Sequence, residues 1–411
     1  MNILIISSCE LPVPAINGGA VETLISLLVA ENENSENNIN VISLYDFFAE
    51  KESINYKKTK FFYQKKSKFI DNIDNIYEKI YQFITKKEHR IKKRYLWKYV
   101  LINRIKKIIK KNEFDTIIFE NAGFLLKILK DNEIKSRYEN NIYYHLHNDV
   151  PSNISSKDIK LCKFILVSNY LKKGLKEKYD IDPAQYDISI LKNGFCTEIF
   201  RQNLSCEENI RIRKELNIDL NQKIILFTGR TNKEKGIEEL VEAFLKMNDE
   251  KFTLLIVGAN NFGQKSKYFF EEKLKKSIAN SDKIKFTGFV KYDEIWKYYN
   301  MAYIVVLPSV WQEPAGLTML ETIESGIPLI TTDVGGIKEY INNTSSIILK
   351  VDQDLINNII KSIRIIDNNY EYYKKEMEKS SQKLSQIYNE YNFYNNFISI
   401  ISRKDKDEEN I

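Results

Sequence analysis

The chain has 411 residues, of which 43% are hydrophobic and 29% charged, and its formal net charge is +6; this length exceeds the size at which one hydrophobic core usually keeps growing, so we expect two domains. No segment approaches the ~18 uninterrupted apolar residues of a membrane-spanning helix, and the N-terminus lacks the basic and apolar regions of a signal peptide, so we expect a cytoplasmic protein that is neither secreted nor integral to a membrane. The four cysteines, Cys9, Cys162, Cys196 and Cys206, include no C-x-x-C pair, which argues against a disulfide framework and against a zinc cluster.

The first half of the chain alternates short apolar runs with helical segments. It opens with a strand-like run over 2–7, a loop that contains Gly18 and Gly19, and an apolar helix from Val21 to about Glu31. Further strand-like runs follow at 40–44, 116–119, 142–145 and 164–167. Such alternation is typical of a parallel sheet that is covered by helices on both faces.

The stretch from Lys57 to Lys111 is strongly basic. It contains nineteen Lys and Arg residues against four Asp and Glu, a local charge of +15 in a chain whose total is +6. Apolar and aromatic residues interleave with these charges at helical spacing, at Ile73, Ile76, Tyr77, Ile80 and Ile84 and again at Ile91, Tyr95, Ile102, Ile105 and Ile109. This combination favours peripheral binding to an anionic membrane surface, without insertion. The alternatives are nucleic-acid binding, for which no reading motif accompanies the charge, and a merely solvated lysine-rich face.

Two histidines lie in the strand-like run IYYHLHND. The period of two along a strand places His145 and His147 on one face, in a chain with only three histidines. Zinc is the rival interpretation, but no third Cys or His has suitable local spacing, and an Asp alone completes the site poorly. Packing explains His145 about as well as catalysis does.

A second series of strand-like runs begins after Gly194. In chain order these runs read KIILFTG, FTLLIVG, KIKFTGF, YIVVLP and IPLITT, with helical segments between them. We therefore predict an α/β protein with two doubly wound domains and a boundary between Lys192 and Asn221. Ten of the fourteen glycines lie at or after position 194, mostly at strand ends, where glycine lets the backbone approach phosphate. The second domain is therefore predicted to hold a nucleotide.

The stretch WQEPAGLTMLETIESGIPLI suggests what that ligand is. Gly316, Leu317 and Thr318 open a helix, whose free N–H groups and dipole favour a phosphate. Glu313 precedes the helix and Glu321 lies about one turn inside it; carboxylates there suit hydroxyl groups rather than phosphate. A ligand with phosphates flanked by polyols is a nucleotide sugar, although a helix start with a stray acidic pair is the alternative.

Positive charge for a diphosphate is available in FTGRTNKEKGIEELVEAF. Arg230 directly follows the strand, and Lys235 precedes Gly236 at the start of an amphipathic helix. An Arg can fork two phosphate oxygens while a Lys acts as a mobile point charge, so together they suit a diphosphate leaving group.

These stretches together with FTGFV and TDVGGIKEYI, in this order and spacing, resemble the retaining GT-B glycosyltransferases of the group 1 family. The resemblance implies two Rossmann-like domains that face each other across a cleft, with no bound metal and no cofactor, and a nucleotide sugar, taken as UDP-linked, as the donor substrate. It implies an acceptor-binding domain over 1–193, a donor-binding domain over 194–379, and a closing helical segment over 380–411 that packs back on the first domain.

The resemblance also implies a role for individual residues. Arg230 and Lys235 would contact the donor diphosphate, Glu313 the hydroxyls of the transferred sugar and Glu321 those of the ribose. His147 would lie near the sugar and act with these groups in catalysis. The remaining donor contacts would be Gly18 and Gly19 over the diphosphate, Val290 beside the base, and Gly316, Leu317 and Thr318 at the helix start.

The expected function is that of a bacterial, retaining, metal-independent glycosyltransferase. It would move a sugar to a cell-surface polysaccharide or glycolipid acceptor that is linked to lipid, at the inner face of the plasma membrane. The alternative is a catalytically silent GT-B partner subunit that stabilises an active transferase, against which the intact Arg230, Lys235, Glu313 and Glu321 argue.

Overall fold

The structure is a computed structural model that describes residues 1–85, 94–148, 161–179, 181–259 and 281–403. Part of the basic stretch (86–93), Asp149, the side chain of Ile84 and the end of the predicted closing segment (404–411) lie outside the described residues. The chain folds into two compact units. Unit 1 comprises Met1–Leu166, Lys172–Leu191 and Tyr394–Ile411, and unit 2 comprises Val167–Leu171 and Lys192–Phe393.

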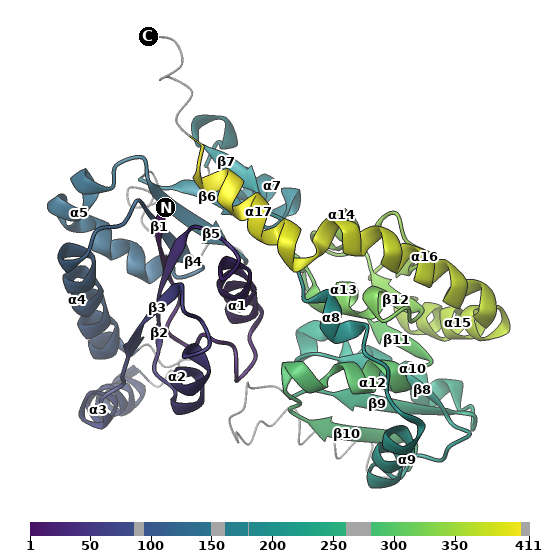
Figure 1. The fold of residues 1–411 in the computed structure, drawn as a ribbon. Coiled ribbons are helices and arrows are strands. Elements are labelled where there is room, and N and C mark those ends of the chain that lie inside the picture. The colour runs from purple at the N-terminus through teal and green to yellow at the C-terminus, as the bar shows by residue number, and fades with distance from the viewer. Residues whose placement is uncertain (86–93, 149–160, 180, 260–280, 404–411) are drawn as a thin grey trace. The chain divides into compact units, whose positions relative to one another are not determined.

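Unit 1 is built on a seven-stranded parallel sheet with the strand order β3-β2-β1-β4-β5-β6-β7. Figure 1 shows these strands side by side, with α1 on one side of the sheet and α4 on the other. The strands are β1 (Asn2–Ile6), β2 (Asn38–Leu44), β3 (Thr59–Gln64), β4 (Thr116–Glu120), β5 (Ile142–Leu146), β6 (Lys163–Leu166) and β7 (Ile188–Ile190). The helical elements are α1 (Ala20–Asn32), α2 (Phe47–Ser53), α3 (Lys68–Thr85), α4 (Tyr95–Lys111), η1 (Gly123–Lys130), α5 (Asn132–Arg137), α7 (Asn169–Tyr179) and η2 (Pro183–Gln185).

Unit 2 is built on a six-stranded parallel sheet with the strand order β10-β9-β8-β11-β12-β13. The strands are β8 (Lys223–Thr228), β9 (Phe252–Val257), β10 (Ile284–Gly288), β11 (Ile304–Leu307), β12 (Leu329–Thr332) and β13 (Ile347–Leu349). The helical elements are α8 (Thr197–Phe200), α9 (Cys206–Glu215), η3 (Lys233–Lys235), α10 (Ile237–Met247), η4 (Tyr292–Glu294), α12 (Trp296–Met301), α13 (Leu317–Glu324), α14 (Ile337–Ile341), α15 (Leu355–Asn368) and α16 (Tyr370–Tyr388). α17 (Glu390–Ile401) begins in unit 2 and continues in unit 1 from Tyr394 onward.

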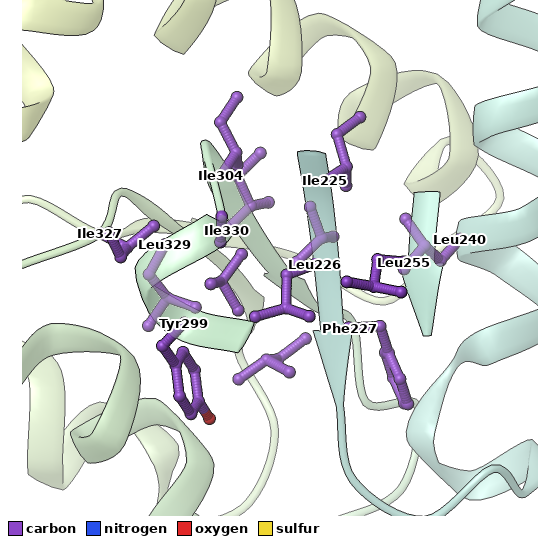
Figure 2. Close-up of a cluster of buried hydrophobic side chains, with 14 of the residues drawn as sticks. Ile225, Leu226, Phe227, Leu240, Leu255, Tyr299, Ile304, Ile327, Leu329 and Ile330 are labelled. Carbon is purple, nitrogen blue, oxygen red and sulfur yellow. The ribbon is translucent and has the colours of Figure 1, made fainter. Parts of the chain in front are cut away.

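The central strands are buried along their whole length because helices cover both faces of a parallel sheet. Every residue of β4 and of β9 is buried. Figure 2 shows the core of unit 2, where Leu226 on β8 lies among side chains of other strands of the sheet, Leu255 on β9 and Ile330 on β12 among them. The predicted α/β class with two doubly wound parallel sheets is confirmed.

In each sheet the order of the strands reverses at one point. The reversal lies between β1 and β4 in unit 1, and between β8 and β11 in unit 2. Ligands of open α/β sheets bind outside the carboxyl ends of the strands at such a switch point. Ligand-binding groups are therefore expected among the residues that follow β1, β4 and β5 in unit 1, and β8 and β11 in unit 2.

The end of the chain joins both units. Residues 380–393, which the sequence analysis groups with the closing segment, lie in unit 2, and residues from Tyr394 onward lie in unit 1. The Tyr394 hydroxyl donates a hydrogen bond of 2.8 Å to Oδ1 of Asn32 at the end of α1. None of the described helices combines the length and the apolar character that a membrane span requires.

Candidate functional site

The loop after β8 brings Lys235 beside the end of β11. Gly236 has φ +70°, and a Cβ at this position would lie 1.8 Å from the carbonyl oxygen of Pro308, which follows β11. Only glycine permits both this conformation and this approach. The close packing places the side chain of Lys235 at the switch point of the unit 2 sheet.

Lys235 and Glu313 form an ion pair there. Nζ of Lys235 lies 2.5 Å from Oε1 of Glu313, and the Ser309 hydroxyl donates to the same oxygen at 2.8 Å. The Glu313 side chain is buried, while that of Lys235 is 26% exposed. Because both partners hold one carboxylate oxygen, the carboxyl group of Glu313 has a fixed orientation.

The loop after β12 holds the backbone of Glu313. Gly335 has φ +58°, and a Cβ at this position would lie 2.0 Å from the carbonyl oxygen of Glu313. The same carbonyl accepts a 2.7 Å hydrogen bond from the amide of Gly336. Gly335 and Gly336 belong to the quoted stretch TDVGGIKEYI, but sequence reasoning assigned them no role.

The helix start predicted for Gly316, Leu317 and Thr318 lies directly after this pair. Gly316 is the N-cap of α13, and no side chain caps the first turn. All three residues are partly exposed. Amide groups at this turn can therefore meet a negatively charged group near Glu313.

Glu321 is buried, whereas a residue that contacts a ribose would be expected to be accessible to the ligand. Its side chain is 3% exposed, and it accepts a 3.0 Å hydrogen bond from the Tyr299 hydroxyl. Burial raises the pKa of Glu321 to about 7, although the hydrogen bond from Tyr299 works against the shift. Contact with a ribose stays a prediction.

Two further predicted donor contacts lie apart from the ion pair. Arg230 follows β8 and is partly exposed; no described residue forms an ion pair or a hydrogen bond with its side chain. Val290 follows β10, which is the edge strand of the sheet, and packs against the core. The structure thus brings Lys235 and Glu313 into contact, and leaves the roles of Arg230 and Val290 as predictions.

Unit 1 carries a second cluster of polar groups at its switch point. Gly18 and Gly19 have φ +74° and +106°, and Gly19 is the N-cap of α1. A Cβ on Gly19 would lie 2.4 Å from Oε2 of Glu22. Burial raises the pKa of Glu22 to about 7, and repulsion from Glu120 adds to the shift. The predicted diphosphate loop therefore has a buried carboxyl group beneath it, which sequence reasoning missed.

Glu120 joins the two histidines into one cluster. It pairs with His145 in the register of β4 and β5, so both side chains lie on the same face of the sheet. Nδ1 of His145 lies 3.1 Å from Oε2 of Glu120, and Nε2 of His147 lies 2.7 Å from the same oxygen. All three side chains are buried, His147 the least so, at 8% exposure.

Burial acts differently on the members of this cluster. Burial lowers the pKa of His147 to about 4, with the neighbouring His145 as the second cause. Burial works to raise the pKa of Glu120, but the two histidines together outweigh it and hold that pKa at about 2. Glu120 is therefore ionised at neutral pH, and His147 is neutral.

Sequence reasoning missed the third member of this cluster. It found no third ligand near the histidines, yet the fold supplies Glu120, and ligand atoms of the three residues lie within 4.8 Å of one another. Two histidines and a carboxylate are a ligand set that a divalent ion can use. The one available signal was the charged residue that ends the apolar run TIIFE.

Comparison with known proteins identifies the family of unit 2. The profile of the family described as "Glycosyl transferases group 1" matches residues 208–383. This part of the chain belongs to the group 1 glycosyltransferases. The chain is 33% identical over 182 residues to an uncharacterized glycosyltransferase of Methanocaldococcus jannaschii, which covers 44% of this chain and 45% of that protein. It is 26% identical over 234 residues to the lipopolysaccharide 1,2-N-acetylglucosaminetransferase of Salmonella typhimurium, covering 56% and 57% of the two chains. The matched segment spans about half the length of these curated relatives.

Solved structures show that the likeness in fold extends over both units. A glycosyltransferase from Rickettsia africae superposes with a TM-score of 0.74 at 20% identity, covering 98% of this chain and 99% of that protein. Anabaena HepE in complex with UDP gives a TM-score of 0.68 at 15% identity, with 98% and 100% coverage. The fold of the chain is therefore the GT-B fold of these glycosyltransferases.

Proposed function

We propose that this protein is a metal-independent, retaining glycosyltransferase that transfers a sugar from a UDP-linked donor. The observation that carries the proposal is the buried carboxylate of Glu313, held by Lys235 and Ser309 directly before an uncapped helix N-terminus at the switch point of the sheet. This arrangement offers a cation and amide groups to a diphosphate, and a carboxylate to hydroxyl groups. Membership of residues 208–383 in the group 1 family and the UDP complex of HepE support the choice of donor.

The proposed reaction uses these groups in the following way. The bond between the anomeric carbon and the diphosphate breaks, while the acceptor hydroxyl forms its bond to that carbon on the same face and gives its proton to the departing diphosphate. Lys235, Arg230 and the first-turn amides of α13 stabilise the negative charge that develops on the leaving group. A diphosphate carries more charge than a carboxylate, so it draws Lys235 away from Glu313. Oε1 of Glu313 then retains its hydrogen bond from the Ser309 hydroxyl and accepts a second one from a hydroxyl of the sugar.

Replacing Glu313 by Gln tests this assignment. A single misplaced or lost transition-state hydrogen bond costs about 100-fold or more in turnover, so Glu313→Gln should lose transfer by at least that factor while UDP still raises its melting temperature. The matched control is Glu242→Gln, an exposed glutamate on α10 that pairs only with Lys246 among the described residues. Wild-type turnover in Glu313→Gln would remove the assignment, and donor binding without any turnover in the parent protein would favour a silent partner subunit.

We further propose that the acceptor is a lipid-linked glycan and that unit 1 meets an anionic membrane surface. The support comes from α3, which presents its apolar residues to solvent. Phe69, Ile73, Ile76, Ile80 and Phe83 repeat at spacings of four and three along one face, and all are exposed, Phe83 by 86%. An exposed apolar stripe of this size marks an interaction surface.

The opposite face of α3 explains this orientation. Asp74 and Glu78 are buried, and the carboxylate of Asp74 accepts hydrogen bonds from the amides of Leu96 and Trp97 at the start of α4. The polar face of α3 therefore caps its neighbour, and its apolar face stays outside. In α4 the opposite holds, because Ile105 and Ile109 of the predicted interleaved set are buried in the core.

The chemistry around the stripe indicates lipid as its occupant. The basic stretch from 57 to 111 surrounds α3 in sequence, and the exposed rings of Tyr77, Tyr95 and Tyr99 lie on α3 and α4. Cationic side chains with aromatic rings at the edge of an apolar face suit the headgroup region of an anionic leaflet. Because the apolar side chains of α3 are exposed, we propose that they insert shallowly into the leaflet. The charge pattern of the sequence alone predicted binding without insertion. The name of the Salmonella relative, a lipopolysaccharide transferase, agrees with an acceptor that carries lipid.

A further inference from the structure

Within the described part of the chain, the cluster of Glu120, His145 and His147 leaves two ring nitrogens without a hydrogen-bond partner. Each histidine directs one nitrogen to the Glu120 carboxylate: Nδ1 in His145 and Nε2 in His147. Nε2 of His145 is buried and has no hydrogen-bond partner within the described part of the chain. No described residue forms a hydrogen bond with Nδ1 of His147. A buried polar atom without a partner calls for an explanation.

The distances identify the contacts to Glu120 as hydrogen bonds. The 2.7 Å between Glu120 and His147 and the 3.1 Å between Glu120 and His145 fall in the usual range for N–H···O bonds. Ligands around a tetrahedral zinc ion, bonded at about 2.0–2.2 Å, lie roughly 3.3 Å apart, and the Glu120–His147 pair is closer than that. An ionised carboxylate only accepts hydrogen bonds, so both histidines must donate to it.

We propose that Glu120 is a positioning residue that fixes both rings in single tautomers, Nδ1–H at His145 and Nε2–H at His147. A neutral ring that donates from one nitrogen accepts at the other. His147 therefore presents Nδ1 as a hydrogen-bond acceptor at the carboxyl end of β5. Nδ1 of His147 would accept a hydrogen bond from a donor such as a hydroxyl group of a sugar. It would not bind an anionic oxygen, which can only accept.

The backbone around the cluster reinforces the choice of tautomer. Asn121 follows Glu120 with φ +51°, donates its amide to the carbonyl of His145 at 2.9 Å, and accepts the amide of His147 on Oδ1 at 3.2 Å. Both hydrogen bonds of Asn121 thus tie the ends of β4 and β5 together directly after Glu120. Because the rings cannot move far from the carboxylate, the proton positions follow from the charge of Glu120.

Nitrogen-15 NMR of histidine-labelled protein tests this proposal directly. The chain has only three histidines, and His89 lies outside the described residues, so the spectrum holds three rings. Assignment uses the His145→Gln and His147→Gln variants. At pH 7 we expect one pyridine-like and one pyrrole-like nitrogen for His147, with Nδ1 pyridine-like, and a protonated Nδ1 for His145. A positively charged ring at His147 in the parent protein, or a mixture of tautomers there, would overturn the proposal.

Glu120→Gln gives the second arm. An amide carries no negative charge, and its donating NH2 group takes the place of one carboxylate oxygen, so a ring nitrogen that meets this group must accept rather than donate and its ring must change tautomer. The matched control is Glu22→Gln, a buried carboxyl in the first turn of α1 that forms no hydrogen bond with either ring within the described residues; its spectrum should keep the wild-type pattern. An unchanged pattern in Glu120→Gln contradicts the proposal. If Zn²⁺ at one equivalent shifts both rings of the parent protein and EDTA reverses the shift, the cluster is a metal site instead.

The link to catalysis rests on the proposed transfer function and has a separate readout. Loss of a group that orients a functional histidine typically costs 10–100-fold in activity, and we expect this loss of turnover in Glu120→Gln with an unchanged affinity for UDP. A protein without transferase activity that shows the expected tautomers would refute the function and leave the positioning role intact. The reverse result, full turnover with mixed tautomers, would refute the positioning role alone.

Discussion

Replacing Gly335 by Ala should damage the candidate site without touching any group that contacts the donor. The φ of +58° costs an L-residue about 1–2 kcal/mol. The new Cβ would also lie 2.0 Å from the carbonyl oxygen of Glu313, where ordinary contact begins at 3.4 Å, so one of the two backbones must shift by more than 1 Å. A displacement of about 1 Å at a reacting group can cost 100-fold in rate. We therefore expect a loss of stability of at least about 1–2 kcal/mol and a loss of turnover of about 100-fold.

The matched control is Gly174→Ala. Gly174 lies within α7, has an ordinary φ, and an added Cβ meets nothing within 4 Å, so this change should stabilise the protein slightly or leave it unchanged. Urea unfolding at pH 7 measures both effects, and turnover with a saturating UDP-sugar measures the site. A Gly335→Ala protein with the stability and turnover of the parent would refute the reasoning. A protein that lost stability but kept full turnover would show that Glu313 tolerates the shift.

Transfer should persist in excess EDTA, because Lys235 and Arg230 supply the positive charge; loss of activity that manganese or magnesium restores would contradict the proposed mechanism. Glu321, whose pKa burial raises from 4.5 to about 7, contributes stability that is present below pH 4.5 and lost as the pH rises through about 7, so Glu321→Gln should gain on the parent in urea unfolding between pH 5 and pH 8; an equal difference at both pH values would argue that burial does not hold this proton. Changing Ile73, Ile76 and Ile80 of α3 together to Gln should weaken binding to anionic vesicles at least about tenfold, since 1.4 kcal/mol is tenfold and a buried isoleucine side chain is worth about 1.5–3 kcal/mol. The control changes Ile210, Ile365 and Ile387, which are 47–55% exposed against 37–57% for the first set, and equal binding by the two triple variants would speak against α3 as the membrane surface.

The sequence predicts the fold well where burial decides it. The runs that become β8, β9, β11 and β12 are apolar and β-branched because helices cover both sides of the sheet, and this requirement is visible in any one strand. β3 was not predicted because Thr59–Gln64 is an edge strand within a lysine-rich stretch, where one side of the pairing is missing and polar residues are tolerated.

The sites were less predictable because tertiary contacts decide them. Glu313 and Lys235 could be proposed from their motifs, but Ser309 and the contact of Gly335 with Glu313 depend on three loops that meet only in the fold. Glu120 lies 25 residues before His145, and only the parallel pairing of β4 with β5 brings the two together. The orientation of α3 depends on Asp74, whose role as a cap for α4 cannot be read from the periodicity of α3 alone.

The two units are interleaved along the chain, and this bears on how the protein can be made. Residues Val167–Leu171 sit in the middle of unit 1 in sequence but belong to unit 2, where the carbonyl of Val167 accepts the Tyr340 hydroxyl at 2.7 Å. Unit 1 in turn needs Tyr394, which forms a hydrogen bond with Asn32 and is translated only after all of unit 2. Domains generally fold in the order in which they leave the ribosome. In this protein unit 1 cannot complete its fold until unit 2 has been synthesised, because the part of the last helix that belongs to unit 1 follows unit 2 in the sequence. A nascent chain of this protein therefore carries an unfinished surface on α1 for almost the whole of its translation.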